Sequence, residues 1–441
     1  MVDAWRDPLQ LFIRGHAAHG PTVGFRFGPY KYVLIHQPED LRHVLVRNHA
    51  NYQKSPTYEG LRLVLGNGLV TSEGAHWKRQ RKLIQPGFHH RAIVDLAEKM
   101  SRCGGEMLED WEARGSEFTT DIHEEMMKVT LRIVGHTLFS KELGGDAREI
   151  GDAIEVCLAH ANEQAESLGL IPQWLPLPKN LRFRKSKAVL DRMVDGIVDE
   201  RRRRGEVVHD LLGMMMAARD PDGPGDAGAS ANTGVMSKDE LRDEVMTLAL
   251  AGHETTANAL TWTLYELARH PEWKRRVHAE LDEVLEGRPA TPDDLPSLEV
   301  TGRVIDESMR LNPPVWAFER VAMGDDEVGG YPIEKGTMIA VCTWTLHRQE
   351  EHWEDPAGFD PTRFEEGRSS DRDRFAYLPF GAGPRVCVGN AFAKMESKLL
   401  LADILTRWDV SLHPGTRVEA EPGVTLRPKH GLPMRLRRRT R

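Results

Sequence analysis

The sequence predicts a mainly α-helical protein with a small β-rich lobe. Residues from about 38 to 220 have mostly helical hydrophobic periodicity, and a second, capped helix spans 237–270. Runs of β-branched and aromatic residues are confined to 22–35 and 329–345. A chain of 441 residues is long enough to bury one large core. We therefore expect a single domain over residues 1–441.

Three segments outside the helices have distinct compositions. Residues 22–35 (TVGFRFGPYKYVLI) contain turn glycines and predict a β-hairpin. Residues 168–180 (LGLIPQWLPLPKN) are apolar and rich in proline, which predicts a structured loop. Residues 220–234 predict a flexible loop. Their GPGDAG run matches the dinucleotide fingerprint, but no strand precedes it and no apolar helix follows directly, so we reject a nucleotide site.

The capped helix has clear start and stop signals. Ser237 and Glu240 form a capping box, and Pro271 follows the last helical residue. The most apolar run within it, 245–264, also carries ionisable and hydroxyl side chains, among them Glu254. This run is too polar for a lipid-facing span, so we expect no transmembrane segment.

Composition excludes several classes of protein. The chain is 40% hydrophobic and 29% charged with a net charge of −8, which argues against a disordered chain and against a strongly cationic nucleic-acid binder. The four cysteines form no C-x-x-C pair, so neither a disulfide framework nor a four-cysteine zinc site is expected. The N-terminus lacks the features of a signal peptide, which favours a cytoplasmic protein.

The segment 380–389 (FGAGPRVCVG) is the strongest chemical signal. It fits the pattern F-x-x-G-x-R-x-C-x-G, in which Cys387 is the candidate ligand and Arg385 can meet a carboxylate beside it. Glycines allow the backbone to turn tightly and to approach a flat ligand closely. An apolar helical pattern follows Cys387, and a cysteine at a helix N-terminus has a stabilised thiolate. Such a thiolate suits an axial ligand of haem iron. We expect the other three cysteines to be structural.

The segment resembles the haem-binding loop of the cytochrome P450 monooxygenases, and further motifs extend the resemblance over nearly the whole chain. Those motifs are AGHETT (251–256), Glu307-x-x-Arg310, PTRF (361–364) and Trp77-x-x-x-Arg81. The resemblance implies the cytochrome P450 fold and a b-type haem whose iron binds Cys387. The other implied haem contacts are Trp77, Arg81, Arg320, Phe380, Gly381, Arg385 and Gly389. For Arg320 a surface position is the alternative.

The motif AGHETT contains an acid and an alcohol inside an apolar helix. Glu254 has no opposite charge three or four residues away, and Thr255 can donate back to the carbonyl of Ala251. The resemblance implies that Glu254 and Thr255 are catalytic and relay protons to bound oxygen. The alternative is a polar pair satisfied in a helix interface. A zinc-peptidase interpretation of His253 fails, because Ala257 occupies the second histidine position.

Glu307 and Arg310 lie three residues apart, on one face of a helix, where they can pair. Such a pair alone is weak evidence. By resemblance, Arg363 of PTRF completes a buried network with them behind the haem loop. We predict a structural role for all three.

The resemblance also indicates a mostly apolar substrate pocket, which suits a lipophilic substrate such as a fatty acid or a terpenoid- or steroid-like molecule. The residues expected to line it are Tyr58, Leu69, Ala249, Leu250, His253, Val315, Trp316, Phe318 and Thr425. The loop 168–180 would lie near the entrance as a lid, with a peripheral membrane contact as a minority alternative.

The predicted activity is that of a soluble bacterial monooxygenase that uses O2 as co-substrate. No flavin site or iron–sulfur cluster is expected in this chain, so electrons would come from a ferredoxin or flavodoxin with its NAD(P)H reductase. Lys78, Arg79, Lys82, Lys394 and Lys398 are candidates for the docking surface, or simply solvated helix faces. The alternatives are an enzyme of the same fold that performs oxidative coupling or dehydration and, more remotely, a non-catalytic haem-thiolate gas sensor.

Overall fold

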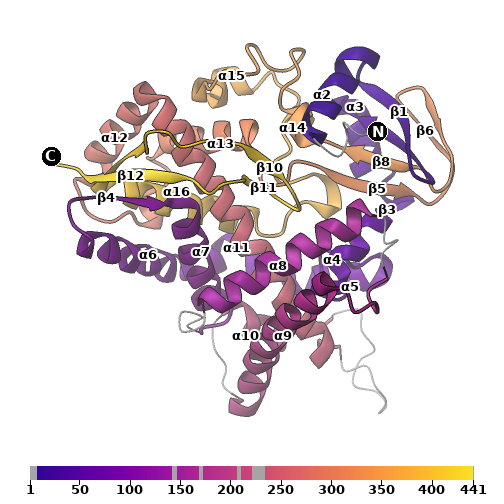
Figure 1. The fold of residues 1–441 in the computed structure, drawn as a ribbon, viewed down its shortest axis with the longest axis horizontal. Coiled ribbons are helices and arrows are strands. Elements are labelled where there is room, and N and C mark those ends of the chain that lie inside the picture. Colours follow the sequence, from indigo (N-terminus) through magenta and orange to yellow (C-terminus); the bar gives the residue numbers. More distant parts are fainter. Residues whose placement is uncertain (1–6, 142–146, 168–171, 206–209, 221–233, 441) are drawn as a thin grey trace.

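The computed structural model describes residues 7–141, 147–167, 172–205, 210–220 and 234–440 (Figure 1). The mainly α prediction is confirmed. The α-helices are α2 (Pro8–His19), α3 (Pro38–Arg42), α4 (Glu59–Leu65), α5 (Gly74–Ile84), α6 (His90–Ala113), α7 (Ile122–Leu138), α8 (Ala147–Glu166), α9 (Pro178–Arg204), α10 (Leu211–Ala217), α11 (Lys238–Arg269), α12 (Pro271–Leu285), α13 (Glu299–Leu311), α14 (Thr343–Leu346), α15 (Glu366–Ser369) and α16 (Asn390–Arg407). Short helical turns are η1 (His43–Arg47), η2 (His49–Asn51), η3 (Pro56–Tyr58), η4 (Gln85–Phe88), η5 (Pro292–Asp294), η6 (Pro361–Phe364), η7 (Arg374–Ala376) and η8 (Gly383–Arg385).

The strands form one larger sheet and three small ones. They are β1 (Thr22–Phe27), β2 (Tyr30–Ile35), β3 (Tyr52–Lys54), β4 (Glu117–Asp121), β5 (Phe318–Ala322), β6 (Asp326–Val328), β7 (Tyr331–Ile333), β8 (Met338–Val341), β9 (Trp408–Leu412), β10 (Ala420–Pro422), β11 (Leu426–Pro428) and β12 (Pro433–Arg438). The larger sheet has the order β1-β2-β8-β5-β3, and a second has the order β4-β12-β9. The pairs β6–β7 and β10–β11 complete the set. The predicted hairpin is confirmed, because β1 and β2 pair antiparallel from Thr22 opposite Ile35.

Alternation along β2 explains why the larger sheet is buried on both faces. Val33 and Ile35 pack into a cluster with Leu41 of α3, while Tyr32 and Leu34 pack into a cluster on the opposite face. Successive side chains of a strand point to opposite faces, so one apolar run serves both clusters. The sheet is thereby held firmly, and with it β5, which carries one of the predicted cofactor contacts.

Helix α11 passes through the middle of the molecule (Figure 1) and packs against α7, α9, α13 and α16. Its predicted capping box is confirmed. The Glu240 amide donates to Ser237 Oγ at 3.1 Å, and the Ser237 amide donates to Glu240 Oε2 at 2.7 Å. The helix ends at Arg269, ahead of Pro271, as expected. Most of its residues are buried, which fixes the positions of its central polar side chains.

Some predicted boundaries were wrong. Strands β3 and β4 interrupt the region predicted as mostly helical. The predicted loop 168–180 ends early because Pro178 begins α9, and a proline at the first helical position is pre-organised for a helix. Residues 343–345, predicted as part of a strand, belong to α14. Residues 168–171 and 221–233 lie outside the described part of the chain.

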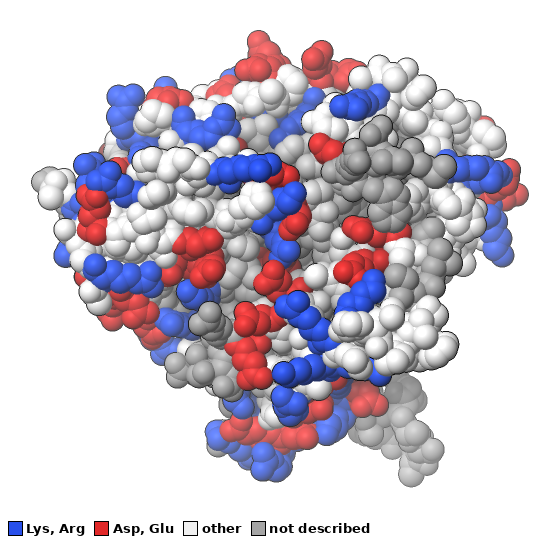
Figure 2. All heavy atoms as spheres, in the orientation of Figure 1, with Lys and Arg blue, Asp and Glu red and all other residues white. Residues whose placement is uncertain are grey.

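Within the described residues, every helix is too short or too polar to cross a membrane. On the face drawn in Figure 2, Lys and Arg side chains are interspersed with Asp and Glu rather than gathered by sign. This face therefore shows no large patch of a single sign of charge.

Candidate active site

Cys387 lies on a tight glycine turn ahead of α16. Gly383 has a φ of +69°, and a Cβ there would lie 1.9 Å from the carbonyl oxygen of Leu45. Only glycine fits both constraints. The amide of Cys387 donates to the carbonyl of Phe380 at 2.9 Å, which closes the turn, and Gly389 caps the N-terminus of α16. The turn therefore holds the cysteine backbone in one position.

The Cys387 side chain is accessible, whereas the other three cysteines are buried. Protein atoms still surround its sulfur closely enough that desolvation raises the pKa of the thiol, while the Gly389 N–H and the positive charge of Arg81 lower it. Arg81 reaches the loop from α5 and donates to the carbonyl of Val386 at 2.8 Å. A bound metal cation deprotonates a coordinating thiol, so this thiol remains a competent iron ligand.

Trp77 and Arg385 form a stacked pair beside the loop. The Arg385 guanidinium carbon lies 3.8 Å from the centre of the buried Trp77 ring. Arg385 donates to the carbonyl of Ser72 at 2.9 Å and pairs with the carboxylate of Glu73. The sequence analysis expected Arg385 to meet a carboxylate, and Glu73 is that group. The stack places α5 and the cysteine loop side by side.

Two further cations, Lys54 and Arg320, lie next to Arg385 of this pair. Lys54 of β3 lies opposite Arg320 of β5 in the sheet register. Desolvation, then the charges of Arg320 and Arg385, hold the pKa of Lys54 well below its usual value, against the opposing effect of Glu73. Arg320 is 7% exposed and donates to the carbonyl of Glu319 at 2.8 Å. Cations crowded in this way favour an anionic ligand between them.

These residues fit a haem. Cys387 offers an accessible sulfur on a fixed turn, and the cations Lys54, Arg81, Arg320 and Arg385 suit the two propionate carboxylates of that cofactor. Phe380 and Gly381, the latter with a φ of +70°, belong to the same turn.

The acid–alcohol pair lies in the middle of α11. Thr255 Oγ1 donates to the carbonyl of Ala251 at 2.7 Å, as the sequence predicts. Glu254 is buried, and its Oε1 accepts a 2.6 Å hydrogen bond from the hydroxyl of Thr425. Burial raises the pKa of Glu254, while the Thr425 hydroxyl and the charge of Arg427 lower it. Glu254 therefore has a neutral partner from the far end of the chain.

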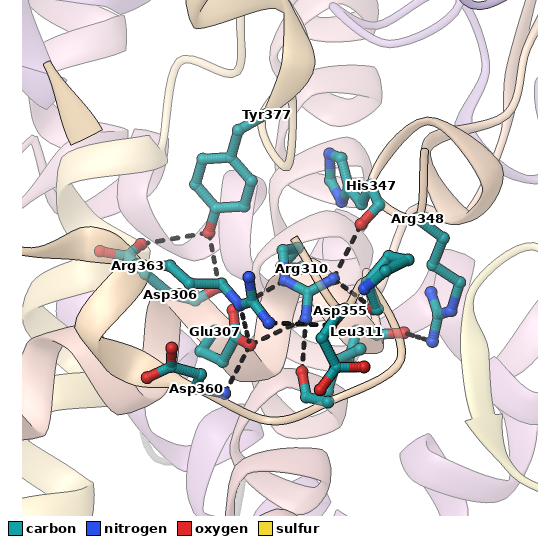
Figure 3. Close-up of polar contacts among 12 residues, drawn as sticks. Asp306, Glu307, Arg310, Leu311, His347, Arg348, Asp355, Asp360, Arg363 and Tyr377 are labelled. Atoms are coloured by element: carbon teal, nitrogen blue, oxygen red, sulfur yellow. Dashed lines mark hydrogen bonds and ion pairs between the residues drawn. The ribbon is translucent and has the colours of Figure 1, made fainter. Parts of the chain in front are cut away.

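Glu307, Arg310 and Arg363 form one buried network (Figure 3). Arg310 donates to both oxygens of Glu307, at 2.7 and 2.8 Å, and Arg363 Nε donates to Glu307 Oε1 at 3.3 Å. Tyr377 donates to the carbonyl of Asp306 at 2.9 Å, just ahead of the cysteine loop. The structure thus joins the three predicted network residues and ties their helix, α13, to the start of that loop.

One predicted pocket residue, His253, lies in the packing between α11 and α7. His253 is fully buried, with its ring against the backbone of Met127 in α7. Residues two apart lie on nearly opposite sides of a helix, so His253 faces away from Ala251, which is accessible. Leu69, Ala249 and Leu250 are buried.

The remaining predicted pocket residues each contact a different group. Trp316 Nε1 donates to the carbonyl of Gly423 at 2.8 Å, and Val315 is 36% exposed. The ring of Tyr58 lies 4.5 Å from Lys54 Nζ. Phe318 lies beneath the Arg320 guanidinium at 5.2 Å, and Thr425 binds Glu254.

Sequence reasoning missed four residues that contact these groups. Lys54 and Glu73 join the cation cluster, while Asn258 and His123 extend the contacts of Thr425. Asn258 carried a weak signal, because it stands one turn after Glu254 in an apolar helix. The other three have no motif, and only the pairing of distant elements reveals them.

Comparison with known proteins identifies the family. The cytochrome P450 family model matches residues 1–432. The chain is 37% identical to cyclooctatin synthase of Streptomyces melanosporofaciens over 96% of this chain and 89% of that protein. It is 38% identical to cyclooctat-9-en-7-ol 5-monooxygenase of the same organism, covering 93% and 87%. It is 34% identical to pentalenene oxygenase of Streptomyces avermitilis, covering 99% and 95%.

The fold agrees with these sequence matches. The crystal structure of the cytochrome P450DA heme domain superposes with a TM-score of 0.87 at 26% identity, over 98% of this chain and 93% of that one. The chain belongs to the cytochrome P450 family.

Proposed function

We propose that this protein is a haem-thiolate monooxygenase that inserts one oxygen atom from O2 into a terpenoid-like substrate. Family membership makes it a haem-dependent oxidoreductase. The observation that carries the proposal furthest is the accessible thiol of Cys387 in the same loop as the partly buried Arg385, whose charge interacts with that of the buried Arg320. A thiolate ligand favours cleavage of the O–O bond at haem iron, and cations pair with the haem propionates.

The proposed roles of the residues follow from their positions. Bound haem supplies the activation of O2 at its iron. Cys387 Sγ would bind the iron, and Arg81, Arg320 and Arg385 would hold the propionates. Glu254 would take up and release a proton from its buried position, and the hydroxyl of Thr255, the next residue on α11, would help to deliver that proton to the haem side of the helix.

The substrate class rests on relatives. Cyclooctat-9-en-7-ol 5-monooxygenase and pentalenene oxygenase are named for reactions on terpenoid molecules. Their similarity over nearly all of this chain favours the terpenoid alternative of the sequence analysis over the fatty-acid one. Buried Leu69, Ala249 and Leu250 are compatible with a compact hydrocarbon.

We further propose that a separate ferredoxin or flavodoxin supplies the electrons. Of the expected docking cations, Lys78 is exposed, and Lys394 has a side chain 53% exposed that lies 3.6 Å from Asp306. Arg79 instead pairs with Glu240, and Lys398 donates to the carbonyl of Leu295. Lys78 and Lys394 are therefore the candidates best placed to meet an acidic partner.

The test is turnover of the haem-loaded enzyme under ¹⁸O2 with NADPH and a surrogate ferredoxin and reductase. Cyclic terpene hydrocarbons and alcohols form one panel, and long-chain fatty acids form the other. One ¹⁸O atom in a terpenoid product supports the proposal. Labelled products from fatty acids alone would reject the substrate class.

Two outcomes of that experiment favour other functions. A product formed with O2 consumption but without ¹⁸O indicates oxidative coupling or dehydration. Haem that binds ligands without any NADPH-dependent product, across both panels, favours the gas-sensor alternative. Cys387→Ser removes the thiolate and should abolish labelled product. The matched control is Cys157→Ser, because Cys157 is buried in α8, a different element from the cysteine loop.

A further inference from the structure

A chain of three hydrogen bonds runs from Glu254 toward the surface. Thr425 Oγ1 donates to Glu254 Oε1 at 2.6 Å, and Asn258 Nδ2 donates to Thr425 Oγ1 at 3.0 Å. Asn258 Oδ1 lies 3.0 Å from His123 Nε2. The chain links α11, the turn between β10 and β11, and the first turn of α7. One chain of hydrogen bonds thus joins three elements that are far apart in sequence.

All donors in this chain point toward Glu254. Because the Asn258 amide nitrogen faces Thr425, its oxygen faces His123 and can only accept, so His123 Nε2 carries the proton of that bond. A hydrogen-bond chain ordered in this way ends on an acceptor, and an ionised carboxylate is a better acceptor than a neutral carboxyl group. The arrangement therefore favours the ionised form of Glu254, against the burial that favours the neutral form.

The four side chains of this hydrogen-bond chain differ in their exposure to solvent. Glu254 is 7% exposed, Thr425 is 6% exposed and Asn258 is fully buried. His123 is partly exposed. Of these four side chains, His123 is thus the one that solvent reaches most readily.

The charged groups around the two ends are few. Arg427 of β11 and Glu155 of α8 act on Glu254 in opposite directions, and these two lie 3.6 Å apart. Asp121 and Glu155 raise the pKa of His123, Arg427 lowers it, and desolvation is the largest cause and lowers it. His253 lies near His123 on α11. With the flanking charges partly cancelled, the hydrogen bond from Thr425 is the direct contact on the carboxyl.

The β10–β11 turn is anchored without this chain of hydrogen bonds. Trp262 Nε1 donates to the carbonyl of Leu426 at 3.0 Å, and Trp316 Nε1 donates to that of Gly423 at 2.8 Å. These two bonds fix the turn to α11 and to the segment before β5. Loss of the Thr425 hydroxyl should therefore affect the orientation and the pKa of the Glu254 carboxyl more than it affects the fold.

We propose that Thr425, Asn258 and His123 are positioning residues that hold the Glu254 carboxyl in one orientation and connect it to the protein surface. This inference rests on the proposed proton-delivering role of Glu254. In the ionised state the chain holds the carboxyl toward Thr425. Protonation removes the charge that the donors complement and so frees the side chain to turn.

The test is an infrared pH titration of the ferric holoenzyme. The protonated carboxyl band of Glu254 is assigned by its loss in Glu254→Gln. In Thr425→Val, the pH at which half of the band is lost should rise by about one unit, the effect of one hydrogen bond to a charged group. Thr425→Ser keeps the hydroxyl and should restore the wild-type midpoint. His123→Phe, at the partly exposed end, should raise the midpoint by less.

The matched control is Thr263→Val. Thr263 is fully buried on the same helix, and its hydroxyl donates to the carbonyl of Ala259 at 2.7 Å, away from Glu254. In this variant the midpoint of the Glu254 band should equal that of the wild type. An unchanged Glu254 band in both Thr425→Val and His123→Phe, at every pH measured, overturns the inference.

A second measurement separates failure of the inference from failure of the proposed function. It is the fraction of NADPH electrons recovered in oxygenated product. If Glu254→Gln leaves this fraction unchanged, the proposed catalytic role of Glu254 is wrong. If Glu254→Gln lowers it while the Thr425 variants leave the infrared band unmoved, only the positioning network is rejected.

Discussion

Arg310 Nε donates to Glu307 Oε2 at 2.7 Å, and neither side chain is exposed. The same guanidinium also donates to the carbonyls of His347, Pro356 and Gly358 (Figure 3). A buried ion pair repays its desolvation only when its remaining donors and acceptors are satisfied. Here they are, so the pair can hold the segment that leads to the cysteine loop.

Removal of one partner should therefore be far more harmful than loss of a surface pair. Glu307→Ala leaves the charges of Arg310 and Arg363 buried without their carboxylate, and should lower the free energy of unfolding by about 3–5 kcal/mol. Arg303→Gln is the control on the same helix, because its pairs with Glu299 and Glu365 are partly exposed and should cost about 0–1 kcal/mol. Urea unfolding followed by circular dichroism measures both. Equal losses in the two variants would contradict the argument.

Local patterns predicted much of this structure. The spacing of Ser237 and Glu240 gave the start of α11, and the i,i+3 spacing of Glu307 and Arg310 gave their contact, because both depend on helix geometry alone. The back-bonded hydroxyl of Thr255 was predictable for the same reason.

Contacts between distant segments were not predictable in this way. Thr425 meets Glu254 across 171 positions, and Lys54 meets Arg320 through the pairing of β3 with β5. Such contacts depend on how whole elements pack, which side-chain spacing does not encode. The orientation of His253 was not predictable for a related reason, because its motif gives a helix but not the face that each neighbouring helix covers.

The cysteine turn should not tolerate a side chain at Gly383. Gly383→Ala combines a φ of +69° with a Cβ 1.9 Å from the backbone oxygen of Leu45, so the backbone itself must move. We expect a loss of about 4 kcal/mol or more in the free energy of unfolding and a lower yield of haem-bound protein. Gly415→Ala is the control, since Gly415 has a φ of +82° with nothing within 4 Å, and strain alone costs about 1–2 kcal/mol. A Gly383→Ala variant as stable as Gly415→Ala would show that the turn adapts.

Arg320 should contribute to haem retention. Arg320→Met removes a 7%-exposed cation from the group that includes Lys54 and Arg385, and a charge-assisted hydrogen bond of about 1.5–3 kcal/mol corresponds to about a 10- to 100-fold loss of haem affinity. The rate of haem transfer to excess apomyoglobin measures this loss. Arg417→Met is the control, because that side chain is 77% exposed beside Glu419. Haem transfer from both variants at the wild-type rate would show that Arg320 does not hold a propionate.

Glu244 should make the fold less stable as the pH rises. The side chain is fully buried on α11, and its Oε2 accepts a hydrogen bond from the Leu69 amide at 3.1 Å. Burial raises the pKa of Glu244 to about 8. The folded chain therefore keeps a proton that the unfolded chain loses near its ordinary pKa, so the stabilisation is complete at low pH and is lost as the pH rises toward 8.

Glu244→Gln keeps an acceptor for the Leu69 amide but cannot ionise. Between pH 6 and pH 9 the wild type should lose on the order of 2 kcal/mol of unfolding free energy more than this variant does. Urea unfolding at the two pH values measures the difference, with Glu109→Gln on the exposed side of α6 as the control that should follow the wild type. Because Leu69 is a predicted pocket residue, substrate affinity should weaken over the same range in the wild type and stay constant in Glu244→Gln. Parallel losses of stability in all three proteins would mean that Glu244 does not titrate in this range.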